Sequence, residues 1–240
     1  MVVNETNAVI ASELEKGVVR GVEALLRARE EVEEYVCKHP KLLLSLTPTP
    51  LKVDMPETVR KMVVASKLAG VGPMAAVAGA IADVARREME KAGAQICLVE
   101  NGGEISLVNR SNKPVYVGLF TGFSGVLPFK LGFKIKPQSK PLGISTSSAT
   151  YGRGVSFGVA DAVTVFASNS AVADAFSTFI CNETRRSDEE LKSLIRKTLE
   201  FSEVFGVFVV KGKKVFLAGD VPELVKVDKD SLFSLTSEVI

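Results

Sequence analysis

The sequence predicts an α+β fold in which a mainly antiparallel sheet is packed with helices. Apolar residues at helical spacing dominate the first third of the chain, and short strands joined by tight turns begin near residue 94. Helical spacing then returns before a terminal hairpin. Because helices and strands occur in blocks rather than in strict alternation, we expect a layered fold built on antiparallel strands.

Three helices are expected before residue 93. The first is amphipathic, with its charges on the face opposite the apolar stripe, and it ends before Pro40. Four prolines then fall within residues 40–56 and predict an irregular connector. Gly93 marks the end of the third helix. The expected helices are 14–36, 56–69 and 73–91.

The rest of the chain contains the expected strands and two further helices. Gly102-Gly103 and Gly212-Lys213 mark tight turns between paired strands. The expected strands are 95–100, 104–109, 115–121, 129–136 and 162–167, and the helices are 171–181 and 188–204. The terminal hairpin joins 207–211 to 214–218.

Composition is that of an ordinary globular protein. The 240 residues are 46% hydrophobic and 24% charged, enough for a substantial core. We expect one domain over residues 1–240, with the first helix and connector in 1–56 and the α+β core in 57–240.

Charge and apolar length argue against several classes of partner. The net charge is +2, which gives no electrostatic reason to expect nucleic acid or an anionic membrane as a partner. The most apolar stretch, 68–82, is shorter than the roughly 20 residues of a spanning helix. The N-terminus lacks the features of a secretory signal. A cytoplasmic location is therefore expected.

Cysteine and histidine usage excludes other chemistry. The three cysteines are far apart and form no CxxC pair, so neither a disulfide framework nor a zinc site is indicated. His39 is the single histidine. One histidine cannot supply a Ser-His-Asp triad and any further function, and it cannot build a multi-histidine metal site.

The first of four segments rich in small residues is 70–80, which contains Gly72 and Gly79. A glycine-rich turn that leads into a helix presents backbone N–H groups and the positive end of the helix dipole, which suit a phosphate. It has neither the Gly-Lys-Ser/Thr of a Walker A loop nor a preceding strand. Tight helix packing is the alternative interpretation.

The second segment is the turn at 100–104, which contains Asn101, Gly102, Gly103 and Glu104. The glycines satisfy a tight hairpin turn. The same turn also places two carboxylates and an amide at one strand end, where a polar ligand can be bound. A plain hairpin is the alternative.

The third segment, 143–154, gathers hydroxyls between two groups of glycines, with Arg153 nearby. Hydroxyls, backbone amides and one guanidinium together predict an anion-binding loop, and a solvated loop is the alternative. No base for a serine nucleophile is visible, which argues against covalent catalysis.

The fourth segment is 169–178. Asp174 and Thr178 are four residues apart, so both side chains project from one face of a helix. A carboxylate and a hydroxyl side by side are hard oxygen ligands of the kind that Mg²⁺ takes. A local hydrogen bond on the helix is the alternative.

These four segments occur in the order found in ApbE-like proteins, whose founding members are FAD:protein FMN transferases. Gly79 followed by Asp83, the Gly102-Gly103-Glu104-Ile105 turn, the Ser145-Thr146-Ser147-Ser148 run and the Asp174…Ser177-Thr178 helix resemble the family's motifs over residues 70–182. The resemblance implies a T-fold-like layered fold. It also implies a flavin ligand, FAD or FMN, and Mg²⁺ held by Asp174, Thr178 and the Ser145 carbonyl.

Three departures separate this chain from the transferases. Ala78 stands where they carry a lysine before the helix glycine, Ser148 replaces the loop glycine, and no histidine follows His39. The chain therefore looks closer to the uncharacterised archaeal and bacterial branch of the superfamily. The residues expected to contact a cofactor are Gly72, Gly79, Asp83, Asn101, Gly102, Gly103, Glu104, Thr146, Ser147, Ser148 and Arg153.

Three hypotheses about function remain open on the sequence alone. The first is a divergent transferase or hydrolase that acts with Mg²⁺ on a flavin or another phosphorylated nucleotide. The second is a cofactor-binding module without turnover. The third is an oligomeric structural protein that has kept only the fold.

Overall fold

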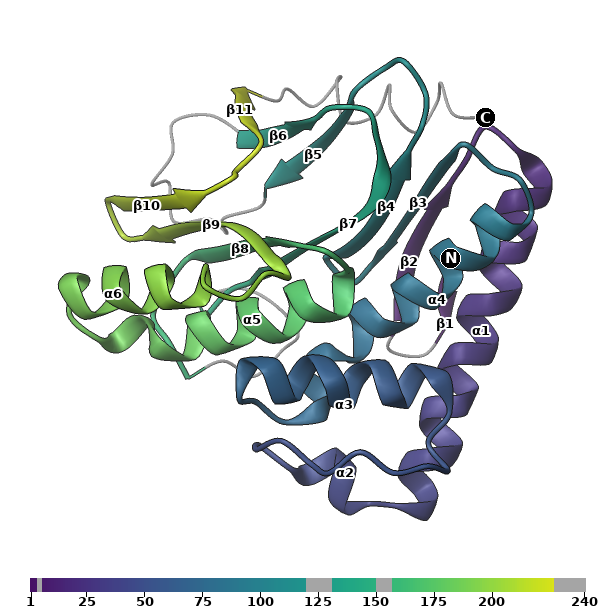
Figure 1. Ribbon diagram of the computed structural model, residues 1–240, viewed down its shortest axis with the longest axis horizontal. Helices are drawn as coiled ribbons and strands as arrows, with labels where there is room; N and C mark the ends of the chain where they lie inside the picture. The colour runs from purple at the N-terminus through teal and green to yellow at the C-terminus, as the bar shows by residue number, and fades with distance from the viewer. Residues whose placement is uncertain (4–5, 120–130, 150–156, 227–240) are drawn as a thin grey trace.

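The computed structural model describes residues 1–3, 6–119, 131–149 and 157–226. Its centre is an eight-stranded antiparallel sheet in the order β1-β2-β3-β4-β7-β8-β9-β10 (Figure 1). The strands are β1 Val2–Val3, β2 Thr6–Ala11, β3 Ile96–Asn101, β4 Glu104–Asn109, β7 Gln138–Ser147, β8 Ala162–Ala167, β9 Val204–Lys211 and β10 Lys214–Gly219.

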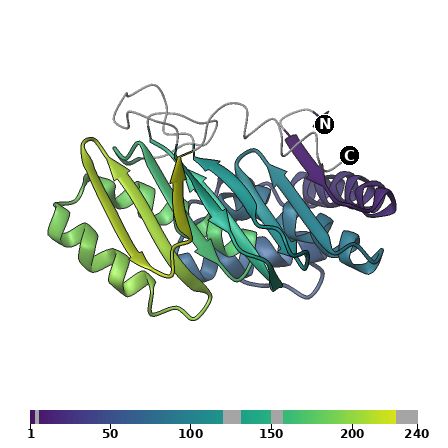
Figure 2. The same ribbon diagram turned by 90° about the horizontal axis from the view of Figure 1, so that it is seen from above.

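A second, three-stranded sheet covers part of one face of the main sheet (Figures 1 and 2). It runs in the order β11-β6-β5, with β5 Val115–Leu119, β6 Leu131–Ile135 and β11 Glu223–Lys226. Phe133 of β6 meets Phe166 and Phe208 of the main sheet edge-on, with ring centroids 4.9 and 5.5 Å apart. Such edge-to-face pairs stabilise the contact beyond the burial of their area.

Helices cover the opposite face of the main sheet. Helices α4 and α5 pack directly on its strands, while α1 packs on α4 and α3 packs on α5. The helices are α1 Glu15–Lys38, α2 Lys41–Leu44, α3 Glu57–Ala69, α4 Val77–Lys91, α5 Ser170–Asn182 and α6 Asp188–Thr198. Two short 3₁₀ turns, η1 Pro73–Ala76 and η2 Glu183–Arg185, complete the set.

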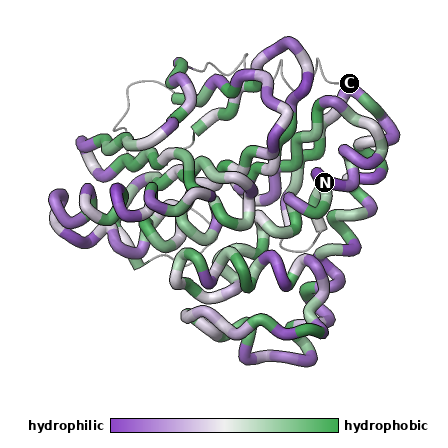
Figure 3. Tube along the Cα trace, in the orientation of Figure 1, coloured by the Kyte–Doolittle hydropathy of each residue, from purple (hydrophilic) through white to green (hydrophobic). Residues whose placement is uncertain are grey.

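Glycines bring α4, α5 and β7 unusually close together. A Cβ on Gly79 would lie 2.3 Å from the Ser170 carbonyl oxygen, and one on Gly143 would lie 2.1 Å from the backbone of Asn169. Only a residue without a side chain fits at such a backbone contact. Figure 3 shows hydrophobic residues along the central strands and hydrophilic residues along outer elements such as α6.

The structure confirms the predicted α+β class and most predicted elements. It also contains strands that the sequence pattern did not reveal, namely β1, β2, β7 and β11. Strand β2 alternates only weakly in polarity, and β7 is rich in hydroxyl residues that resemble a loop. Helix α6 ends at Thr198 instead of 204, and Val204 already begins β9 because it pairs with Ala167 of β8.

No single helix in the described ranges is long and apolar enough to cross a membrane. Only when joined are the segments Glu57–Ala69 and Pro73–Lys91 long and apolar enough to span a membrane. The chain bends by 105° at the break between them.

Candidate functional site

Parts of all four predicted segments meet on the helical side of the main sheet. They are the start of α4, the β3–β4 turn, the end of β7 and the middle of α5. The link between the two helices is direct, because the backbone N–H of Gly79 donates to Oδ2 of Asp174 at 3.0 Å. Asp174 is only 8% exposed, so this carboxylate lies within the protein layer.

A row of hydroxyls connects β7 to α5 beside Asp174. The Ser177 hydroxyl lies 2.9 Å from those of Ser145 and Ser147, and it also donates to the backbone carbonyl of Asp174 at 3.0 Å. The Thr178 hydroxyl lies 3.4 Å from that of Ser147. These oxygens come from two elements that are more than 20 residues apart in sequence, and together they form a polar strip inside an otherwise apolar layer.

Two carboxylates face this strip and disturb each other's ionisation. Burial, opposed by the Gly79 N–H and aided by the charge of Asp83, raises the pKa of Asp174 to about 7. Burial and the nearby charges of Asp174 and Glu100 raise the pKa of Glu104 well above its usual range. The Ser145 hydroxyl lies 3.4 Å from Oε1 of Glu104. Asp174 is buried and Glu104 is half-buried, so the ionised forms of both are stable only when a proton or a cation offsets their charge.

The β3–β4 turn is fixed by its own hydrogen bonds. Gly102 and Gly103 have φ values of 71° and 116°, which L-residues with side chains rarely adopt. The N–H of Gly103 donates to the Glu100 carboxylate at 2.6 Å. The buried Asn101 donates to the Ala78 carbonyl at 3.1 Å, which ties the turn to the start of α4. The turn therefore positions Glu104 relative to both helices.

Asp83 anchors the N-terminus of α5. Its carboxylate accepts from the backbone N–H groups of Ser170 and Ala171 at 3.0 Å each, and from the Ser106 hydroxyl at 2.6 Å. Asn169 adds a side-chain cap by accepting from the N–H of Val172. A carboxylate at a helix N-terminus is favoured by unpaired N–H groups and by the helix dipole. Asp83 thus already has three partners within the protein.

Some predicted cofactor contacts lie away from this strip. Gly72 packs against the connector, since a Cβ there would lie 1.8 Å from the Ser45 carbonyl oxygen. The expected hydroxyl loop is a strand as far as Ser147, so its side chains alternate between faces. Thr146 therefore bonds Thr164 of β8 at 2.9 Å on the opposite face of the sheet. Ser148 follows β7 directly, and Arg153 lies outside the described residues.

The donor set fits a hard cation only in a limited way. Within the described residues, no group of three or more His, Cys, Asp or Glu side chains is placed to hold a metal. Asp174 and Glu104, with the hydroxyls of Ser147 and Thr178, supply oxygen donors alone. Mg²⁺ accepts such a set because it keeps several waters and is completed by the phosphates of its ligand.

Ser177 is the residue of the site that sequence reasoning passed over. It is fully buried and bonds two strand hydroxyls, so it links α5 to β7. Ser177 is three residues after Asp174, so both side chains lie on one face of α5. This spacing could have identified Ser177 as a site residue from the sequence.

The fold and the site together define an ApbE-like layered α+β protein with a buried strip of acids and hydroxyls. Residues 1–201 match the family model described as AbpE bacteria, and the chain belongs to that family.

Full-length relatives support the same placement. The UPF0280 protein of Methanocaldococcus jannaschii is 42% identical over 233 residues, which cover 95% of this chain and 93% of that protein. The UPF0280 protein of Archaeoglobus fulgidus is 39% identical over 225 residues, covering 92% of this chain and 91% of that protein.

Solved structures share less with the chain. The flavin transferase ApbE from Vibrio cholerae is 16% identical with a TM-score of 0.45, covering 86% of this chain and 75% of that one. The ApbE protein of Thermotoga maritima is 14% identical with a TM-score of 0.46 and covers 68% of this chain. The match spans about half, 53%, of the Thermotoga chain.

Proposed function

We propose that this protein binds a flavin or another phosphorylated nucleotide together with Mg²⁺, at the strip between α5 and β7, and acts on it as a divergent transferase or hydrolase. One observation carries the proposal. Asp174 and Glu104 are carboxylates whose ionised forms are both disfavoured in the absence of a counter-charge. A divalent cation would supply that charge at neutral pH.

The residues of the strip divide into two roles in this proposal. Asp174, Thr178 and the Ser145 carbonyl would hold the cation, with Glu104 as a further acidic donor. Ser147 and the backbone around the β3–β4 turn would contact the ligand. The bound cation would neutralise the charge of a pyrophosphate. Gly79 and Asn101 would be positioning residues. Gly79 aligns Asp174 through its backbone N–H, and Asn101 fixes the turn that carries Glu104. The preference for a flavin rests on the motif resemblance.

Calorimetric titration with FAD tests the binding step. The parent protein should bind FAD more tightly with Mg²⁺ than with a chelator present, and Asp174→Asn should remove that difference. The variant keeps the size of the side chain and loses its charge. Glu200→Gln, on an exposed residue after α6, is the matched control. Equal affinity for FAD with and without Mg²⁺ in the parent would contradict the metal role.

A binding module without turnover is the second candidate, and one observation favours it. The hydroxyls of Ser145, Ser147 and Ser177 bond other oxygens, and within the described residues none of them hydrogen-bonds to a histidine or lysine that could act as its base. Incubation of FAD with the protein and Mg²⁺, followed by chromatography, separates the candidates. Release of FMN and AMP supports catalysis, whereas unchanged FAD supports the module.

The broader expectations remain predictions. They are a single domain over 1–240, a cytoplasmic location, a small phosphorylated ligand as the main partner in place of nucleic acid or a membrane, and a homo-oligomer. Size-exclusion chromatography with light scattering measures the last of these directly.

A further inference from the structure

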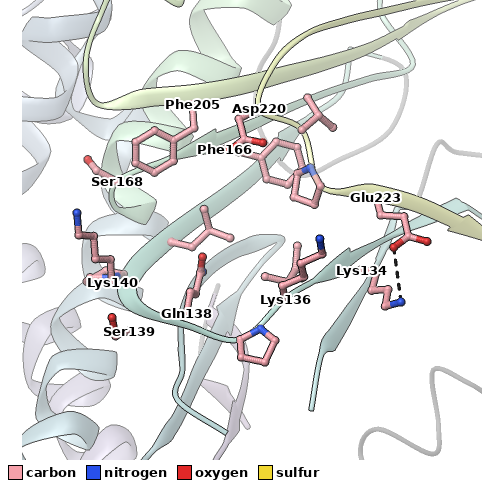
Figure 4. Close-up of a pocket in the computed structure, with 16 residues that line it drawn as sticks. Lys134, Lys136, Gln138, Ser139, Lys140, Phe166, Ser168, Phe205, Asp220 and Glu223 are labelled. Atoms are coloured by element: carbon pink, nitrogen blue, oxygen red, sulfur yellow. Dashed lines mark ion pairs between the residues drawn. The ribbon is translucent and has the colours of Figure 1, made fainter. Parts of the chain in front are cut away.

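A groove lies on the other side of the main sheet, between it and the three-stranded sheet. It encloses about 810 Å³ and is lined by the stretch from β6 into β7, by parts of β8 and β9, and by the β10–β11 connection (Figure 4). It shares no residue with the strip around Asp174. Its volume falls within the range of pockets that hold small molecules, about 300–1,000 Å³.

One wall of the groove is polar and positively charged. Figure 4 shows Lys136, Gln138 and Lys140 side by side on the β6–β7 stretch, facing the opposite wall. Lys134 is paired with Glu223 at 3.5 Å, whereas Lys136 and Lys140 form no ion pair within the described part of the chain. The Nε2 of Gln138 is buried and has no hydrogen-bond partner. Among the described residues, the unpaired charges on this wall therefore come from Lys136 and Lys140.

The facing wall is aromatic. Phe166 is 1% exposed and forms the floor, while Phe205 is 38% exposed and offers a ring to the groove (Figure 4). Asp220 lies on the same wall. Apolar walls with a few convergent polar groups are typical of sites that bind small organic ligands.

We propose that this groove binds a planar aromatic ligand that carries an anionic group. The ring packs against Phe205, and the anion lies between the ammonium groups of Lys136 and Lys140. Asp220, on the aromatic wall, orients the ligand by repelling its anion toward the lysines. This site is separate from the one proposed for the nucleotide.

Two fluorescent probes with related rings and different charge test the proposal. Anilinonaphthalene sulfonate carries one negative charge, and N-phenyl-1-naphthylamine is its neutral counterpart. The parent should bind the sulfonate saturably at one site and more tightly than the neutral probe. The double variant Lys136→Gln/Lys140→Gln should weaken sulfonate binding about tenfold, because charge-assisted contacts are the strong ones, and leave the neutral probe unchanged.

Matched variants locate the site and separate it from the nucleotide site. Phe205→Ala should weaken both probes, while Asp174→Asn and the exposed pair Lys192→Gln/Lys197→Gln should weaken neither. Circular dichroism confirms that each variant is folded. The proposal is overturned if the lysine pair at 136 and 140 does not affect sulfonate binding, or if Phe205→Ala leaves both probes bound as in the parent.

Discussion

The two faces of strand β7 differ sharply in chemistry. Ser145 and Ser147 face α5 and join a buried strip with carboxylates, whereas Leu142 and Ile144 face the second sheet and pack with phenylalanines. Because strand side chains alternate, a single strand contributes to a polar site on one side and to an apolar core on the other. The comparison shows that adjacent residues in the hydroxyl run need not share a role.

The two faces should also differ in how they respond to change. The aromatic face is held by packing and should lose stability in proportion to the volume removed. The polar face depends on paired hydrogen bonds and on the protonation of two acids, so it should respond to pH and to cations.

Phe208→Ala should have the largest effect on stability. Phe208 is 1% exposed and packs edge-on against Phe133, so its loss leaves a cavity between the two sheets. We expect the free energy of unfolding to fall by about 3–5 kcal/mol, measured by urea denaturation. Mg²⁺-dependent FAD binding should persist in the folded variant. If Phe208→Ala lowers the free energy of unfolding by less than a substitution at an exposed position does, the second sheet contributes little to the stability of the core.

Asp83→Ala should have the next largest effect, on the polar face. The change leaves two backbone N–H groups and the Ser106 hydroxyl without their acceptor at the start of α5. We expect a loss of about 1–3 kcal/mol in the free energy of unfolding. Glu200→Ala, an exposed site, is the control. A loss no larger than that of the control would contradict the anchoring role of Asp83.

The stability of the metal-free protein should fall as the pH rises from about 4 to about 7. The pKa of Asp174 is raised from 3.8 to about 7, so in this window the folded state retains a proton that the unfolded state has released. One such proton gives a slope of at most about 1.4 kcal/mol per pH unit. Denaturation at several pH values measures the slope.

Asp174→Asn should reduce this pH dependence, because the amide does not titrate and Glu104 remains as the other carboxyl group of the site with a raised pKa. Mg²⁺ should stabilise the parent most at the upper end of the window, where the carboxylates would otherwise be ionised without a partner. A slope that is the same in the parent and in the variant would exclude Asp174 as its source.

Thr146→Val should have the smallest effect on stability. Together with Ser147→Ala, it compares two adjacent residues that lie on opposite faces of β7. Its partner Thr164 loses one hydrogen bond, so we expect about 1 kcal/mol of destabilisation and no change in ligand affinity. Ser147→Ala, on the opposite face, should lower the affinity for FAD with Mg²⁺. The reverse pattern would place the ligand between the two sheets.

Local signals predicted much of the fold. The amphipathic stripe of α1 and the glycines of the β3–β4 turn are features of short range, so the order of helices and strands could be read from such signals. The pairing of Asp174 with Thr178 on one helical face followed from spacing alone.

The tertiary structure decided which of those residues act together. Whether Ser145 or Thr146 faces α5 depends on the register of β7 against β4 and β8, which no local pattern fixes. The contact between Gly79 and Asp174 joins residues 95 positions apart, and the pKa of Asp174 is raised mainly because folding buries its carboxyl group. The sequence by itself determined most of the helices, the clearest strands and the candidate groups. Only packing could place those groups on one face of the sheet, because burial and proximity are properties of the folded chain.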